Sequence, residues 1–358
     1  MEKTKNKIKK PYIIAETAYN HEGDITYLFS MIDEIADIKL NAIKFHLLLN
    51  PQSYMTKQHP LFKDINKWLF NEKKWTEIIN YSIKKNLDVI ALCDDVESIK
   101  FINKKFENIA AIEIHATGIN DYFLLKEIVN FKGKIILGIG GTSLDEIQYA
   151  LNFFKNQGKH DIILMYGFQN FPTNYLDINL QKMEKIRDLF DLPIGYADHT
   201  SYDDSHNEVI SIMAAAMGFN ILEKHYTLSP GAKRIDNVAA VGKNQMKKIK
   251  EMMEIALKIY GNGDIELSEN EKAYGNIGPM KKAIVAKNSI KKGDKINLDK
   301  ICFKRTAEES TIKQDQLPLL LGLRATKNIE KDEIIDFNKV TYKFKKHYSK
   351  TVGLNQKK

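Results

Sequence analysis

The stretch "PIGYADHT" at residues 193–200 is a short apolar run that ends in an Asp–His pair. Such a run is typical of a strand buried on both faces, with polar residues only where the strand ends. The pattern recurs along residues 11–262, where short apolar runs alternate with stretches of helical periodicity. The strand candidates are "YIIAET" at 12–17, "AIKFHL" at 42–47, "DVIAL" at 88–92, "IAAIEI" at 109–114, "KIILGI" at 134–139, "DIILMY" at 161–166, "PIGYA" at 193–197 and "NILEKH" at 220–225.

Eight strands separated by helices predict a (β/α)8 barrel, the TIM-barrel fold, because short apolar strands that alternate with helices favour a parallel sheet covered on its outer face. "TSLDEIQYALNFFKNQG" at 142–158 illustrates the helical part, with Thr142 or Ser143 as N-cap and Gly158 as its stop. Active-site side chains of this fold lie at the carboxyl ends of the strands. Polar residues at those ends therefore indicate function.

The composition and the hydrophobic pattern of the chain change after residue 262. "GNGDIELSENEKAYGNIGP" is polar and glycine-bearing, and "KKAIVAKNSIKKGDKINLDKICFKR" beyond it contains two short strands around a Lys-Gly turn. We therefore expect a barrel over 1–262, a linker at 263–279, a small β-rich domain at 280–345 and a basic tail at 346–358.

Composition narrows the function classes. The 358 residues carry a net charge of +8 from lysines spread along the chain, without the clustered charge and interleaved aromatics of a nucleic-acid binder. This charge fits an anionic small substrate. No apolar run reaches the length of a membrane helix, so we expect a cytoplasmic protein that binds neither membrane nor nucleic acid. Cys93 and Cys302 match no metal or disulfide spacing, which fits a reducing compartment.

Polar residues gather at the predicted strand ends. Because side chains alternate along a strand, three pairs each share one face. His199 and His225, on neighbouring strands, are positioned to hold one divalent metal between neutral imidazoles. A lysine inside a barrel mouth is costly unless it meets an anion, so Lys44 predicts a phosphate or carboxylate partner, and Glu16 predicts sugar binding or acid–base work. The same-face pairs are Lys44 with His46, Glu113 with His115, and Glu223 with His225.

Several of these motifs resemble the sialic acid synthase family. They are "IIAETAYNHEGD", "AIKFHLL", "FPTNYLDINLQKMEKIRDLFDLPIGYADHT", "ILEKHYTLSPGAKRIDNVAA" and "MKKAIVAKNSIKKGDKINLDKICFKR". The resemblance covers nearly the whole chain and implies a TIM barrel joined to a C-terminal antifreeze-like (SAF) domain in a domain-swapped homodimer. It implies a transferase that condenses phosphoenolpyruvate with an N-acetylated hexose, at a divalent manganese or magnesium ion, to give a nonulosonic acid.

The resemblance also implies roles for single residues. His199 and His225 become the metal ligands, and with Glu16 and Lys44 they form the expected catalytic set. Glu16 and Asp236 become sugar contacts, Lys44 meets phosphoenolpyruvate, and Arg305 reaches into the partner's barrel. The remaining residues expected to bind substrate are Asn20, His46, Glu113, His115, Gln169 and Phe171.

The donor site departs from the family pattern. A Ser-Thr-Pro-Phe-like end of strand three reads "ALCDD" here, with Leu92 in the threonine's place, and Glu113 stands where the family has a lysine. Exchanging lysine for Glu113 changes the local charge by two units, and each unit about 4 Å from a phosphate contributes about 4 kcal/mol at an effective dielectric constant of about 20. The glycines of "GIGG" could compensate with backbone amides. The other departures are Ala116, Gly118, Gly138 and Ala197.

Three hypotheses follow for this chain. The first is a sialic-acid-synthase-like enzyme of nonulosonic acid (surface sugar) biosynthesis. The second is a metal-dependent aldolase-like or lyase-like variant with another small anionic donor and with Glu113 or His115 as base. The third is a non-catalytic barrel scaffold. His46, with Glu113 and His115, either enlarges the metal site, or His46 and His115 only form hydrogen bonds to one another or to the backbone.

Overall fold

The computed structural model describes residues 8–170 and 172–342, and the basic tail expected at 346–358 lies outside them. The chain divides into two compact units between Asp264 and Ile265. Each unit is described by itself, beginning with the barrel.

Eight parallel strands close the barrel of the first unit in sequence order, which confirms the predicted fold. Each runs within one or two residues of its apolar run, because the apolar residues are those that the barrel buries on both faces. The strands are β1 (Tyr12–Glu16), β2 (Ala42–Leu47), β3 (Asp88–Cys93), β4 (Ala111–Ile114), β5 (Lys134–Gly138), β6 (Ile162–Tyr166), β7 (Ile194–Asp198) and β8 (Ile221–His225).

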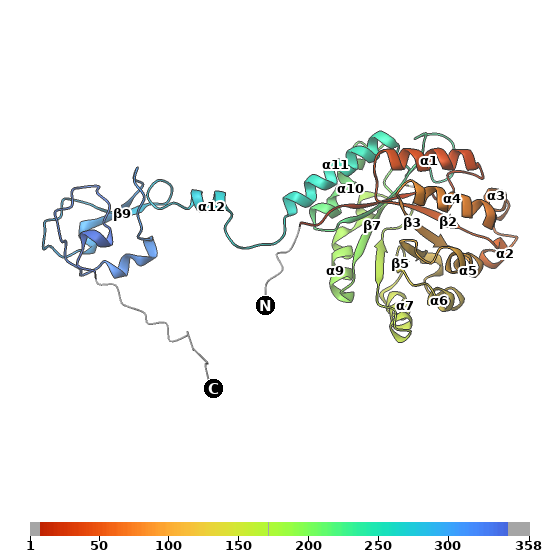
Figure 1. Ribbon diagram of the computed structural model, residues 1–358, viewed down its shortest axis with the longest axis horizontal. Helices are drawn as coiled ribbons and strands as arrows, with labels where there is room; N and C mark the ends of the chain where they lie inside the picture. Colours follow the sequence, from red (N-terminus) through yellow and green to blue (C-terminus); the bar gives the residue numbers. More distant parts are fainter. Residues whose placement is uncertain (1–7, 171, 343–358) are drawn as a thin grey trace, which may run out of the picture. The chain divides into compact units, whose positions relative to one another are not determined.

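Helices cover the outside of this barrel (Figure 1). Side-chain caps fix where several of them begin, and Ser143 is the N-cap of α7, in a capping box with Glu146. The longer helices are α1 (Ile25–Asp37), α4 (Glu72–Lys84), α5 (Val96–Lys105), α6 (Tyr122–Ile128), α7 (Leu144–Asn156), α9 (Leu180–Phe190), α10 (Asn207–Ala216) and α11 (Lys243–Tyr260). Shorter ones are α2 (Pro51–Tyr54), α3 (Phe62–Trp68), α8 (Tyr175–Ile178) and the 3-10 turn η1 (Ala116–Gly118).

Strand alternation separates two kinds of buried surface. Residues that point outward, such as Phe45, Leu137 and Leu222, belong to the large core between strands and helices. Each such side chain stabilises the fold by roughly 1.5–3 kcal/mol when fully buried. Inward-pointing residues fill the lower barrel with a separate apolar cluster made of Ile14, Ala42, Ile90, Ala111, Ile136, Met165 and Ala197. The next inward positions toward the carboxyl ends are largely polar, and they form the floor of the site.

Backbone segments approach each other closely where β5, β6 and β7 end. Gly167 has a φ of 134°, and a Cβ atom there would collide with the carbonyl oxygen of Ala197. A Cβ on Gly140 would likewise collide with the carbonyl oxygen of Gly167. These glycines are needed because they let three consecutive strand ends close over one side of the barrel mouth.

The second unit is small and rich in short extended segments, as predicted. Strands β9 (Ala283–Ala286) and β10 (Ile301–Lys304) pair in antiparallel fashion around a core that includes Ile284 and Ile335. The helix α12 (Glu269–Tyr274) lies within the segment expected as a linker. In the described parts of the chain, no helix is long and apolar enough to cross a membrane. The remaining elements are the 3-10 turns η2 (Leu298–Lys300), η3 (Gln314–Leu319) and η4 (Phe337–Lys339).

We expect Gly167→Ala to destabilise the barrel, because the added Cβ meets a fixed backbone carbonyl and the positive φ disfavours any L side chain. Gly158→Ala is the control, since Gly158 also has a positive φ (71°) but open space around its Cβ position. Urea unfolding followed by the fluorescence of Trp68 and Trp75 should show a loss at least about 2 kcal/mol larger for Gly167→Ala. Equal losses would contradict the steric argument.

Candidate active site

A cavity of about 520 Å³ opens at the carboxyl ends of the barrel strands. Its size is within the range of small-molecule sites. Most of the residues that the sequence assigned to the site line it, and they come from four strands and from the segments that follow strand ends. Those residues are Glu16, Lys44, His46, Glu113, His115, Gln169, His199, His225 and Asp236.

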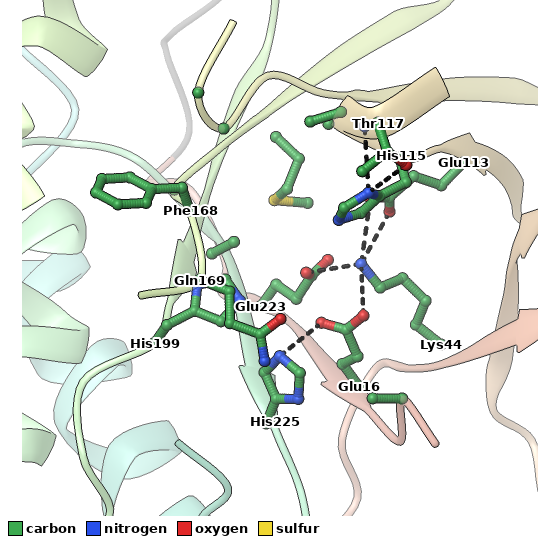
Figure 2. Close-up of a pocket in the computed structure, with 18 of the residues that line it drawn as sticks. Glu16, Lys44, Glu113, His115, Thr117, Phe168, Gln169, His199, Glu223 and His225 are labelled. Carbon is green, nitrogen blue, oxygen red and sulfur yellow. Dashed lines mark hydrogen bonds and ion pairs between the residues drawn. The ribbon is translucent and has the colours of Figure 1, made fainter. Parts of the chain in front are cut away.

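Lys44 lies at the centre of the cavity floor, surrounded by three carboxylates (Figure 2). Its Nζ is 3.2 Å from Glu16 Oε1, 3.1 Å from Glu113 Oε2 and 2.7 Å from Glu223 Oε1. Burial by itself would lower the pKa of Lys44, but the three carboxylates outweigh it and raise the pKa above its usual value. Lys44 is therefore a charged ammonium that is already paired within its own chain.

The three carboxylates differ in the direction in which their pKa values are shifted. Burial favours the neutral acid in each, but Lys44, His225 and His46 together hold the pKa of Glu16 well below its usual value. Burial raises the pKa of Glu113 and raises that of Glu223 well above its usual value, despite the same lysine. Glu16 is thus more acidic than a free glutamate, and Glu113 and Glu223 are less acidic.

Glu16, His199 and His225 form a candidate metal site. Their ligand atoms all lie within 4.8 Å of one another, and His225 Nε2 is 3.4 Å from Glu16 Oε2. Burial lowers the pKa of His199 to about 4 and that of His225 to about 3, so both imidazoles are neutral at pH 7, the form that binds metal. The buried Nδ1 of His199 has no hydrogen-bond partner among the described residues. Two neutral imidazoles and an ionised carboxylate fit a divalent cation.

His46 and His115 lie near this cluster without joining it. His46 places Nε2 2.7 Å from Glu16 Oε1, and this contact raises the pKa of His46 although burial opposes it. His115 places Nδ1 3.0 Å from Thr117 Oγ1, and burial lowers its pKa to about 4. His46 therefore bonds to the side chain of Glu16, whereas the hydrogen bonds expected for it were to His115 or the backbone. The carboxylate of Glu16 thereby links Lys44, His46 and the metal ligands.

Four other predicted residues take different places. Asp236 lines the cavity and accepts a 2.8 Å hydrogen bond from Gln169 Nε2. Asn20 does not line it, because its buried amide donates to Ile235 O (2.9 Å) and holds the loop that carries Asp236. Arg305 lies in the second unit and donates from Nε to Pro279 O (2.7 Å). Phe171 lies outside the described residues.

Glu223 is the residue that the sequence reasoning noticed but gave no role. Its position two residues before His225 put it on the same face, which was the available signal. The contacts of Glu223 depend on the register between β8 and β1, where the barrel closes. Alternation of side chains along one strand does not give this register. In the structure it makes the shortest of the three contacts to Lys44, while its Oε2 is buried without a hydrogen-bond partner among the described residues.

A buried ion pair holds the strand ends that carry the two histidines. Asp198 and Lys224 are opposite each other in the β7–β8 register, and Lys224 Nζ is 2.7 Å from Asp198 Oδ2 with both side chains fully buried. Asp198 also accepts hydrogen bonds from Thr200 and Ser211. These bonds hold the end of β7, which His199 follows directly. Asp198 is not a helix N-cap, since the next helix, α10, begins at Asn207.

These features define a class of protein. A closed (β/α)8 barrel with a histidine–histidine–carboxylate cluster at the carboxyl ends of its strands is the architecture of a barrel enzyme with a candidate metal site. The model of the NeuB family matches residues 31–265, and that of the SAF domain matches residues 281–341. The chain belongs to the NeuB family, and the expected sialic-acid-synthase resemblance is confirmed.

Individual relatives agree with this assignment. The chain is 29% identical over 344 residues to an N,N'-diacetyllegionaminic acid synthase of Campylobacter jejuni, covering 92% of this chain and 99% of the relative. It is 27% identical over 324 residues to an uncharacterized protein of Methanocaldococcus jannaschii, covering 90% and 93%. Among solved structures, an N-acetylneuraminic acid synthetase of Leptospira borgpetersenii in complex with citrate is similar with a TM-score of 0.68 and 29% identity, covering 74% of this chain and 90% of that one.

Removing one member of the Asp198–Lys224 pair should cost far more than removing both. Asp198→Ala leaves the Lys224 ammonium buried without its counter-charge, and we expect a loss of about 3–5 kcal/mol in the free energy of unfolding. Adding Lys224→Met should recover a large part of that loss, because a flexible apolar side chain replaces the unpaired charge. Urea unfolding of both variants measures this, and a double variant no more stable than Asp198→Ala would show that the pair is not coupled.

Proposed function

We propose that this protein condenses phosphoenolpyruvate with an N-acetylated hexose to form a nonulosonic acid, in a reaction that depends on a divalent metal. One observation carries the proposal: Glu16, His199 and His225 meet at the mouth of the cavity in a chain of the NeuB family. The names of the relatives, among them legionaminic, pseudaminic and N-acetylneuraminate-9-phosphate synthases, support the product class.

The proposed roles follow from the positions of the side chains. His199, His225 and Glu16 would hold manganese or magnesium, which supplies Lewis acidity toward an aldehyde oxygen when bound. Glu16, shared between Lys44 and His46, fixes where charge and protons lie beside that ligand set. Asp236 and Gln169 form a hydrogen-bonded pair in the cavity wall and suit contacts to sugar hydroxyls. Carbon–carbon bond formation then joins the aldehyde carbon to the enolpyruvyl methylene carbon, and water addition at the neighbouring carbon releases phosphate.

A second candidate function is favoured by the surroundings of Lys44. Of the residues that line the cavity, it is the one lysine or arginine, and its ammonium is already paired with three carboxylates. Such a floor offers little positive charge to a phosphate group. An aldolase-like reaction with a donor that lacks phosphate, such as pyruvate, would meet less repulsion. Glu113 or the neutral imidazole of His115 is then the candidate base.

The deciding experiment incubates the manganese-loaded protein with a panel of acetamido hexoses, including 6-deoxy diamino derivatives, and with either phosphoenolpyruvate or pyruvate. Phosphate release and the mass of a nine-carbon product are measured in parallel. Phosphate release that depends on one sugar supports the synthase and names its acceptor. Product from pyruvate alone supports the aldolase. Absence of product together with absence of bound metal would leave the scaffold hypothesis.

We expect His199→Ala to bind Mn²⁺ at least tenfold more weakly than the wild type while it remains folded, because one of three candidate ligands is lost. His160→Ala is the matched control, since His160 is exposed and lies outside the cavity. Equilibrium dialysis with metal analysis gives the affinity, and thermal unfolding reports the fold. Unchanged manganese binding in His199→Ala would show that the ligand assignment is wrong.

The proposal includes the homodimer that the family resemblance implies. In it, Arg305 of one protomer contacts the acceptor in the partner's barrel, as the family resemblance implies. Sedimentation velocity of the full chain tests the assembly.

A further inference from the structure

A second cavity of about 320 Å³ adjoins the first. It lies among the end of β3, the turn η1, the helix α6 and the segment of α2 and α3 that follows β2. His115 and Thr117 line both cavities, so a ligand in the barrel mouth has this second space next to it. Its apolar lining residues are Tyr54, Met55, Leu61, Ile65 and Leu124.

Asp94 is the unusual residue of this cavity. It follows the last residue of β3, is 7% exposed, and lines the cavity. Its Oδ2 accepts a long hydrogen bond of 3.3 Å from the Tyr19 hydroxyl, and the nearest imidazole atom, His46 Nδ1, is 3.9 Å away. In residues 8–170 and 172–342, no lysine or arginine forms an ion pair with it. Burial raises the pKa of Asp94 to about 6, so the group is a carboxylate at pH 7.5.

Other buried carboxylates of the barrel are compensated more directly than Asp94, whose charged neighbour is the imidazole of His46 at 3.9 Å. Asp95 accepts hydrogen bonds from the backbone amides of Asn50 (2.5 Å) and Ser98 (3.0 Å), and Asp198 is paired with Lys224. A buried carboxylate without such partners is costly unless something else provides a positive charge or N–H donors. Because Asp94 faces an empty volume rather than packed side chains, the missing partner fits a ligand group.

The charged side chains of the second cavity indicate which kind of ligand group would bind there. The second cavity is lined by two carboxylic acids, Asp94 and Asp121, and by no lysine or arginine. Asp121 is already engaged, because its carboxylate caps α6 at Phe123 and Leu124. The lining also includes two histidines, His59 and His115. Asp94 is therefore the carboxylate that an ammonium group in this cavity would contact. An anionic substituent would meet repulsion here, whereas an amine gains an ion pair.

We propose that the second cavity is a subsite for a free, protonated amino group on the acceptor sugar, and that Asp94 is the residue that recognises it. The proposal rests on the proposed function, because it takes the aldehyde end of the same sugar to lie at Glu16, His199 and His225. The acceptor class is then a hexose with a free amine besides its acetamido group. The apolar wall of Tyr54, Leu61 and Leu124 suits the carbon side of such a sugar.

The test is binding to the manganese-loaded protein at pH 7.5, measured by isothermal titration calorimetry. The probes are hexoses with a free amine at C2, C3, C4 or C6, each compared with its parent hydroxy sugar. We expect at least one amino hexose to bind at least tenfold more tightly than its parent. Asp94→Asn should abolish that preference, so that the amino hexose and its parent sugar bind with similar affinities, because the substitution removes the charge and keeps the shape.

Two further variants keep the test decisive. Asp94→Phe replaces the carboxylate with a bulky apolar side chain, and it should remove the amine preference by filling the cavity. Asp95→Asn is the matched control, since it removes an equal charge from the neighbouring residue whose carboxylate bonds to backbone amides. It should lower stability but keep the preference. Absence of any amine preference in the wild type, or its survival in Asp94→Asn, overturns the proposal.

The outcome is independent of turnover. A protein that binds manganese and prefers an amino hexose but makes no product retains the subsite and loses the proposed reaction. A protein that releases phosphate with a sugar lacking free amines, and in which Asp94→Asn changes nothing, keeps the reaction and loses the subsite.

Discussion

The buried ammonium of Lys44 is the constraint on which the site depends. A charge at this depth in a barrel is tolerated only with counter-charges, and Glu16, Glu113 and Glu223 supply them from β1, β4 and β8. Below this level the barrel is filled by an apolar layer that includes Ile14 and the side chains at the same height. The ion cluster therefore marks where packing ends and the cavity begins, and it ties together strands that are far apart in the chain.

The same cluster determines the electrostatics of the candidate metal site. Glu16 is ionised because Lys44, His225 and His46 oppose the effect of its burial, and this ionised carboxylate lies beside two imidazoles that burial keeps neutral. Each condition is one that divalent metal binding requires. Behind the imidazoles, the pair of Asp198 and Lys224 braces β7 and β8 against each other. The charges that hold the strands together therefore lie beside the charges that line the cavity. Removal of one charged residue from a pair leaves its partner uncompensated.

Sequence reasoning reached the barrel and most of the cavity because both depend on local patterns. Apolar runs located all eight strands, and the carboxyl ends of neighbouring strands placed His199 and His225 at the same mouth. It could not give the contacts across strands. Lys44 was expected to meet a substrate anion, and the structure gives it partners within the chain. Glu223 and Asp94 were not assigned, since their meaning depends on barrel closure and on a neighbouring cavity, neither of which a strand pattern contains.

The acidic floor of the cavity bears on donor recognition. Lys44 is paired with Glu113 and two further carboxylates, so the side chains of the floor do not form a cationic cradle. Gly138 and Gly140 lie in the lining without side chains, and backbone amides near them are candidate contacts for a phosphate. A neutral or cationic sugar needs no such contacts. The acidic floor therefore restricts the donor more severely than the acceptor, and the acceptor is the partner for which the two cavities are better suited.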